Sequence, residues 1–167
     1  MSCLAARDSA VEQIRAGMLP LFPKMTVEAH PGVFTEQTIR RDAQRTPAIL
    51  TSPVRAEDGT YRNGLTFVSR VLYRASAEDR LYDGALKIIS ALIPVIRKAE
   101  FNAYTKDTAI DAECLYTGAL DAINVTLWAV KWETVLGDRA FIKEIPDDLG
   151  ELEYVRGTAA VGVGSRA

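Results

Sequence analysis

The residues of this sequence that could carry out chemistry are few and lie far apart. The single histidine, His30, precedes a proline in a predicted turn, and the sequence places no partner beside it. A histidine in such a position is more often an ordinary loop residue than a catalytic base or a metal ligand. Cys3 and Cys114 are isolated from each other, so we expect two free thiols, as in a protein made in a reducing cytoplasm.

The sequence motifs for metal, phosphate and nucleophile chemistry are also missing. There is no CxxC, no HExxH and no Gly-x-Ser-x-Gly. Asp107, Asp111 and Glu113 could gather near one strand end, but they lack the loop spacing of a calcium site. The glycine-rich run at residues 157–164 has no Lys-Ser/Thr and opens no helix, so it does not predict a phosphate loop. We therefore expect no catalytic residue, no cofactor and no metal.

The composition predicts a soluble globular protein. The 167 residues fit one domain, or one domain with a tail; 48% of them are apolar and 25% are charged. The net charge of −2 argues against general nucleic-acid binding, which usually needs a basic excess. The sequence has no apolar run of membrane-spanning length and no secretory signal at its start, so we expect no membrane partner.

The stretch Asn124–Val135, NVTLWAVKWETV, is the segment around which the fold is predicted to form. As an extended strand it is apolar on both faces through its middle, so we expect it to be covered on both sides, centrally in a sheet or at a subunit contact. Trp128 and Trp132 share one face and are predicted to form a platform for a helix. Core packing is the simpler interpretation of the pair; the alternative places one tryptophan in a subunit interface.

Hydrophobic periodicity predicts the remaining elements. A first helix is expected over Asp8–Leu19 with Asp8 or Ser9 as its cap, and a half-buried strand over Lys24–Ala29. Thr35–Gln44 is predicted to be a short polar helix, capped by Thr35 and anchored by Ile39. A weak strand over Asp107–Tyr116 is expected to break at Thr117-Gly118.

Pro47–Val54 and Leu65–Tyr73 are predicted to form a charged hairpin whose tip projects beyond the domain. Asp58-Gly59 supplies a tight turn and Asn63-Gly64 a second bend. Pro53 cannot donate to a ladder, so the first strand is expected to be an edge or to carry a bulge. The candidate interface residues on this hairpin are Arg55, Glu57, Asp58 and Arg62; two more, Arg40 and Arg41, lie on the short helix. Each of the six is equally well interpreted as solvated charge.

Ser76–Ala99 is predicted to be the main helix, opened by a capping box at Ser76 and Asp79. Its two adjacent apolar stripes suit a helix that lies across a sheet. Pro94 removes a backbone bond late in the helix, so a kink or an early stop is expected there. Residues 1–137 are therefore expected to form one α+β domain, and 138–167 read as an extended C-terminal arm.

This order of elements resembles the tail terminator proteins of tailed phages, in particular those of Mu-like phages and prophages. The resemblance covers roughly residues 5–137. It is most evident in the long helix that opens within AEDRLYDGALKII and in the late strand TLWAVKWETVLG. It is a likeness of pattern and does not extend to the arm.

The resemblance implies a structural virion protein of the tail and neck, assembled in the host cytoplasm, with no enzymatic step. Members of that family have helices packed against a mixed, mostly antiparallel sheet, so the resemblance implies such a sheet with the long helix and the N-terminal helix on one face. They form a hexameric ring that caps the tail tube, stops its polymerisation and offers a surface to the head-side neck. The implied partners are further copies of the chain, the tail tube protein and a neck or connector protein, with no sequence-specific nucleic acid. The alternatives are another neck or head-completion protein and, from a different class, a small cytoplasmic binding module or hydrolase.

Overall fold

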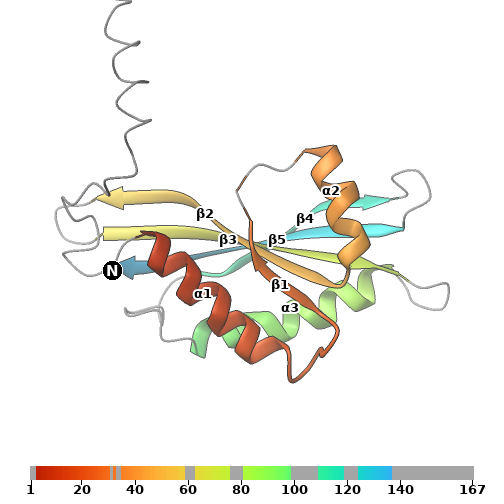
Figure 1. Cartoon of the computed structure of the whole chain (residues 1–167), viewed down its shortest axis with the longest axis horizontal. Helices are drawn as coiled ribbons and strands as arrows, with labels where there is room; N and C mark the ends of the chain where they lie inside the picture. Colours follow the sequence, from red (N-terminus) through yellow and green to blue (C-terminus); the bar gives the residue numbers. More distant parts are fainter. Residues whose placement is uncertain are drawn as a thin grey trace, which may run out of the picture.

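The protein forms a five-stranded sheet with helices on both faces (Figure 1). The computed structural model describes residues 3–30, 32, 35–58, 63–75, 81–98, 109–118 and 124–136. The elements within them are α1 (Cys3–Met18), β1 (Thr26–Ala29), α2 (Glu36–Asp42), the 3-10 helix η1 (Ala43–Arg45), β2 (Ala48–Asp58), β3 (Asn63–Arg74), α3 (Leu81–Lys98), β4 (Asp111–Gly118) and β5 (Val125–Leu136). The predicted α+β class is confirmed; the arm 138–167 lies outside the described residues.

The strands follow the order β1-β2-β3-β5-β4. β1 runs parallel to β2, and every other pairing is antiparallel, so the sheet is mixed and mostly antiparallel as expected. β3 and β5 pair along their whole length, from Asn63 opposite Leu136 to Arg74 opposite Val125. The tryptophan strand β5 is thus an inner strand, with β3 on one side and β4 on the other.

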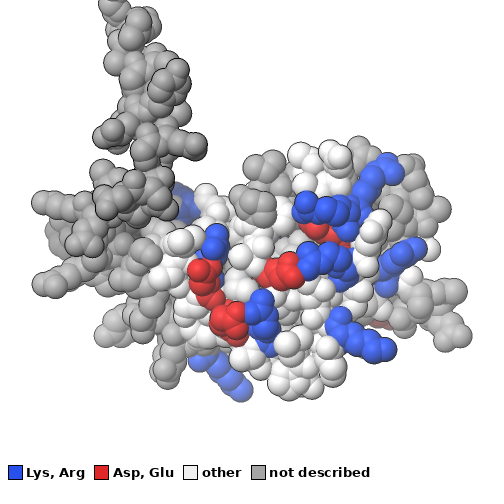
Figure 2. Space-filling view, in the orientation of Figure 1, with Lys and Arg blue, Asp and Glu red and all other residues white. Residues whose placement is uncertain are grey.

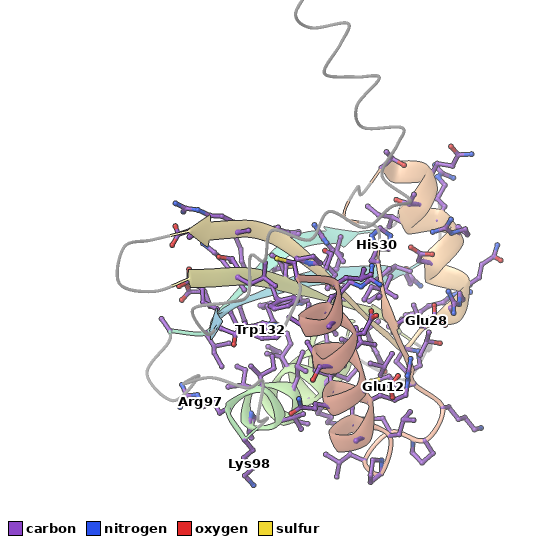
Figure 3. The ribbon with its side chains drawn as sticks, turned by 60° about the vertical axis from the view of Figure 1, so that its left-hand side comes forward. Glu12, Glu28, His30, Arg97, Lys98 and Trp132 are labelled. Atoms are coloured by element: carbon purple, nitrogen blue, oxygen red, sulfur yellow. The ribbon has the colours of Figure 1, made fainter. Side chains whose placement is uncertain are left out.

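One face of the sheet, here called the core face, is covered by α1 and α3 (Figures 1 and 3). Trp132 lies at its centre with no exposed surface and stacks on Phe67 of β3, with ring centroids 4.4 Å apart. The helices contribute small and aliphatic side chains to this core, chiefly Ala6, Ala10, Ile14, Met18, Ile88, Leu92 and Ile96. The prediction that the tryptophan strand supports a helix is confirmed for Trp132.

The opposite face, here called the α2 face, is covered only in part. Ile39 of α2 packs over a small cluster formed by Ala48, Leu50, Leu72 and Leu127. Further along β5 this face carries the exposed Lys131 and the half-buried Glu133. The expected cover on both faces of β5 is therefore supplied by α2 at Leu127, within the same chain.

The first helix begins at Cys3, five residues before the predicted start. Ala6 and Ala10 are buried, which extends the buried face toward the N-terminus because small alanines allow close packing on the sheet. The prediction that Asp8 or Ser9 caps the helix is wrong. Asp8 lies inside α1 and pairs with Arg7, and Ser9 accepts a hydrogen bond from Gln13.

The two hairpin strands are longer than predicted and pair out to Asp58 opposite Asn63. A register shift between Pro53 and Arg55 confirms the bulge, and β1 pairs with β2 only as far as Thr51, so the outer half of β2 has no neighbour in β1. The second bend predicted at Asn63-Gly64 is wrong. Both residues are held extended because β3 pairs there with β2 and β5 at once. The tip, residues 59–62, lies outside the described residues.

The long helix α3 runs to Lys98, four residues past Pro94, so an early stop at the proline is wrong. Its proposed cap at Ser76 and Asp79 lies outside the described residues. The break expected at Thr117-Gly118 is also wrong, because β5 supplies partners for both residues at Thr126 and Val125. No described helix combines the length and apolar character that a membrane crossing requires.

Candidate functional site

A buried polar cluster joins the end of β1 to α2. The backbone N–H of His30 donates to the carbonyl of Thr51 at 2.9 Å, which continues the parallel pairing of β1 with β2 and places the imidazole beneath α2 (Figure 3). Asp42 is the last residue of α2, and its Oδ2 lies 3.5 Å from His30 Nε2. Both side chains are only 3% exposed. His30 lies in the loop after β1 as predicted, but it is buried and has a partner, Asp42, which the sequence did not indicate.

Hydrogen bonding sets the tautomer of this histidine. The backbone N–H of Gly32 donates to His30 Nδ1 at 3.1 Å, so Nδ1 is an acceptor and the proton of the neutral ring lies on Nε2, facing Asp42. Burial lowers the pKa of His30 below its ordinary value of 6.5; Asp42 opposes this shift, and Arg70 and Arg41 add to it. The net direction is downward. The pair is thus a neutral imidazole beside a carboxylate near pH 7, not an ion pair.

Two arginines complete the cluster. Arg41 donates from Nε to Asp42 Oδ1 at 2.9 Å, and this bond together with the carboxylate charge raises the pKa of Arg41. Arg70 of β3 donates to the Ser52 hydroxyl on the neighbouring strand at 2.9 Å, and burial lowers its pKa. Charged groups from α2 and from the sheet therefore surround His30. The cluster positions α2 on its face of the sheet.

The same surroundings limit what this cluster can do chemically. A general base must lie within hydrogen-bonding reach of a substrate proton, and neither His30 nor Asp42 has a surface that a substrate could reach. Among the described residues, no group of His, Cys, Asp and Glu is arranged to hold a metal ion. Cys3 and Cys114 are free thiols, each half-buried. The arrangement is that of a structural polar cluster.

The protein matches no protein-family model and no curated protein.

The core face holds a second buried polar group. The Ser69 hydroxyl lies 2.9 Å from the Thr51 hydroxyl and accepts a hydrogen bond from Trp132 Nε1 at 3.0 Å. Ser69 and Thr51 are fully buried, so their hydroxyls cannot bind water in the folded protein. These hydrogen bonds replace the ones that water would provide in the unfolded chain. Trp128 differs from Trp132 because it is half-buried and its buried Nε1 has no hydrogen-bond partner among the described residues. The sequence-based candidate Trp132 is a core residue; Trp128 lies at the margin of the core.

The charged interface candidates fall into two separate groups. Arg40 and Arg41 lie in the last turn of α2, where Figure 2 shows basic side chains gathered on the surface. Arg55 and Glu57 pair with each other on the outer half of β2, at the opposite end of the strand from the α2 contact. Asp58 ends β2, and Arg62 lies outside the described residues. The structure does not bring the two groups together.

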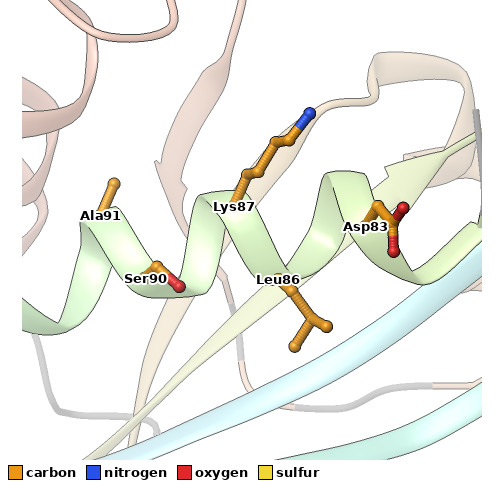
Figure 4. A pocket seen from close by; sticks show the side chains of 5 residues that line it. All are labelled: Asp83, Leu86, Lys87, Ser90 and Ala91. Atoms are coloured by element: carbon orange, nitrogen blue, oxygen red, sulfur yellow. The ribbon is translucent and has the colours of Figure 1, made fainter.

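A shallow, open depression lies on the outer surface of α3 (Figure 4). All of its described lining comes from this one helix: Asp83, Leu86, Lys87, Ser90 and Ala91. Polar groups from other elements do not converge on it within the described residues, whereas small-molecule sites usually combine groups from several elements. We do not assign it a ligand.

The residue that sequence reasoning missed is Asp42, and a signal for it was present. Asp42 and Ala43 follow Ile39 by three and four residues, the spacing that places side chains on the same side of a helix. Since Ile39 is the predicted anchor of this helix, the spacing places Asp42 on the side that faces the sheet. A buried aspartate requires partners, and the arginine beside it and the only histidine were the candidates.

Proposed function

We propose that this chain is a structural virion protein, a tail terminator that forms a ring, caps the tail tube, stops its polymerisation and joins the tail to the head-side neck. The order of helix, strand, hairpin strands, long helix and late strand over residues 3–136 supports this proposal, since it is the order on which the resemblance rests.

The observation that carries the proposal is the contrast between the inside and the surface. The only histidine and its aspartate partner are closed off from solvent, whereas charged side chains are displayed at both ends of the sheet. An enzyme of this size would need accessible acid–base groups in a cleft. A protein that binds large partners needs charged and apolar surface instead, and the described region offers both.

In the proposed mechanism, one face of the ring binds the last layer of the tube and blocks the addition of tube subunits. Arg55 and Glu57 lie near the end of the β2–β3 pair, which extends further out than α1 in Figure 1, and are the candidates for that contact together with Asp58 and Arg62. The opposite face then meets the neck protein.

The test is made in the phage or prophage that encodes the chain. Deleting the gene should yield tubes of uncontrolled length that join no heads, counted by negative-stain microscopy. Restoring the chain with Arg55→Glu and Arg62→Glu should fail to correct tail length, whereas Lys24→Glu, an exposed charge on the turn after α1, should correct it. Tails of normal length joined to heads in the deletion strain would refute the function. Normal tails with the double variant would exclude the hairpin only.

Oligomeric state separates this function from the other classes. A terminator should form rings, or assemble with tube protein, by light scattering and negative-stain microscopy. A small hydrolase or binding module would stay a low-order species under both conditions. A ring that binds the connector but leaves tube length unchanged would instead indicate another neck or head-completion protein.

A further inference from the structure

The outer half of β2 is an open edge among the described strands. β1 pairs with β2 only as far as Thr51, and no other strand that the structure describes lies beside residues 52–58 on that side. Val54, at the bulge, is 47% exposed, and Arg55 and Ala56 are exposed as well. An open edge displays backbone N–H and C=O groups with which a further strand can pair.

The pairing of β2 shows which of its residues face this edge. The Thr51 carbonyl accepts a hydrogen bond at 2.9 Å from the backbone N–H that follows β1, so Thr51 faces β1 and the next residue, Ser52, faces β3. The partners of Ser52 and Arg55 on β3 are two residues apart, so Arg55 faces β3 as well. By alternation, the backbone groups of Ala56 and Asp58 face the open edge.

A segment of suitable length and composition follows β5 in the same chain. Pro53 faces the open edge and has no N–H to donate, so an added strand can exchange hydrogen bonds with β2 only beyond the bulge. Residues 141–145, FIKEI, have the length of that part of β2 and are followed by Pro146. Three of these five residues are phenylalanine or isoleucine, which favour strands.

The end of β5 brings this segment within reach of the open edge. Leu136 lies opposite Asn63, which lies opposite Asp58, so β2 and β5 end at the same side of the sheet (Figure 1). The position beside β2 is three strand spacings from β5, roughly 14 Å. The six residues from Leu136 to Ile142 can span about 20 Å, which is enough for the chain to cross and turn back. A strand that returns there runs antiparallel to β2 and completes the strand order of a Greek key.

We propose that residues 141–145 pair with the outer half of β2 in the same chain and extend the sheet by a further strand. The assigned backbone pairs are Ile142 with Asp58 and Glu144 with Ala56. In this register Lys143 lies beside Glu57, whose charge is opposite, and Pro146 falls at the level of the bulge.

This pairing is compatible with the contact proposed for the hairpin and does not depend on it. Arg55 and Glu57 pair with each other on one face of the sheet, and side chains on a face stand roughly perpendicular to the direction of strand pairing. A strand at the edge therefore leaves both side chains available to a partner. It also covers backbone groups through which copies of the chain could otherwise aggregate.

A strand from another molecule is the competing occupant of the edge. The segment 141–145 is tethered to β5 by a short connection, which gives it an effective concentration in the millimolar range. A free partner at the concentrations used in solution studies is far more dilute. Tethering therefore favours the chain's own segment.

Amide hydrogen exchange of the full chain, measured at single residues, tests the pairing. The N–H groups of Ala56 and Asp58 should exchange at least about tenfold more slowly than in an unstructured chain. Glu144→Pro removes a donor that faces β2 and should make both amides exchange fast. Lys143→Pro is the matched control, because the N–H of Lys143 faces away from β2 in the assigned register, and slow exchange should remain.

Two internal references make the result decisive. The amides of Arg55 and Glu57 face β3, so their slow exchange in every variant shows that the hairpin strands stay paired. Dilution by about a hundredfold should leave the slow exchange of Ala56 unchanged, because a tethered strand does not dissociate.

Fast exchange of Ala56 in the wild-type chain, or slow exchange that Glu144→Pro leaves unchanged, would overturn the inference. Protection that disappears on dilution would assign the edge to a strand of another molecule and would overturn it as well. Tail length in the deletion strain is a separate measurement, so the inference and the proposed function can fail independently.

Discussion

The two faces of the sheet are built from the same strands and covered in different ways. The core face lies beneath α1 and α3, and its polar groups Ser69, Thr51 and Trp132 bond to one another. The α2 face has a small apolar cluster beneath Ile39, a polar cluster around His30 and, further along β5, the exposed Lys131. Alternation of side chains along each strand allows both arrangements in one sequence.

The core face of the sheet mainly stabilises the fold, whereas the α2 face is available for contact with other chains. On the core face the helices exclude water, so burial of large side chains supplies most of the stabilising free energy. On the α2 face a short helix is held by a few polar bonds while its arginines face outward. Substitutions on the core face should therefore change the free energy of unfolding strongly, whereas those on the α2 face should change pH dependence and assembly.

The largest expected effect is a loss of stability, and it should differ between the two tryptophans. Trp132→Ala should lower the free energy of unfolding by about 3–5 kcal/mol, since it removes a fully buried ring stacked on Phe67. Trp128→Ala should cost clearly less, because that side chain is half-buried and its indole N–H donates no hydrogen bond to any residue that the structure describes. Urea denaturation of both variants measures the difference. Equal losses would show that the margin of the core contributes as much as its centre.

The next effect concerns the polar group within the core face. Ser69→Ala removes the acceptor of the Trp132 indole and a partner of the Thr51 hydroxyl, so it should cost about 1–3 kcal/mol. Ser90→Ala is the matched control, because Ser90 is exposed on α3 and alanine favours a helix. The control should be neutral or slightly stabilising by thermal unfolding. A neutral Ser69→Ala would mean that these buried bonds add no net stability.

The α2 face should show its effect in pH dependence. The pKa of His30 is lower in the folded chain than its ordinary 6.5, so the unfolded chain binds more protons as pH falls. Stability should therefore decrease from pH 7 toward pH 5, with a slope of at most about 1.4 kcal/mol per pH unit. His30→Gln should flatten this slope, and the assignment is clear because the chain has one histidine.

The carboxylate beside His30 provides the control for that experiment. Asp42 raises the pKa of His30 against the larger effect of burial, so Asp42→Asn should lower that pKa further. The loss of stability that accompanies protonation of His30 would then extend to lower pH values. An NMR titration of the single imidazole measures both values directly. A midpoint above 6.5 in the native chain would contradict the neutral pair and reverse the sign of the pH dependence.

The elements of the fold were largely predictable because strands and long helices carry regular apolar patterns. Alternation predicts β3, and a run that is apolar on both faces predicts β5; Pro53 predicts an edge or a bulge in β2, and the structure has the bulge. The errors occurred where a tertiary partner overrides a local signal. Asn63-Gly64 favours a turn in isolation, but two flanking strands hold it extended. The N-terminal start of α1 was missed because alanine is a weak apolar marker.

The candidate site was less predictable for a different reason. Contact between His30 and Asp42 depends on how α2 lies on the sheet, which the local pattern does not determine. The arginine pair was found from its charge, yet only the structure shows that Arg41 bonds to the buried Asp42. Among the described strands, the open outer half of β2 also depends on where β1 ends, which the sequence of β2 does not show.

The smallest effect concerns how α2 begins. The Thr35 hydroxyl accepts a hydrogen bond from the Thr38 N–H at 3.2 Å, and the Thr38 hydroxyl accepts one from the Thr35 N–H at 2.8 Å, forming a reciprocal cap. Thr35→Ala should cost about 1 kcal/mol of helix stability, and Thr35→Ser should retain most of it because the hydroxyl is kept. Hydrogen exchange of α2 amides measures this locally. If the α2 face contributes mainly to contact, the alanine variant should also weaken assembly while leaving exchange in α1 unchanged. Faster exchange throughout α1 and α3 would instead show that the two faces unfold as one unit.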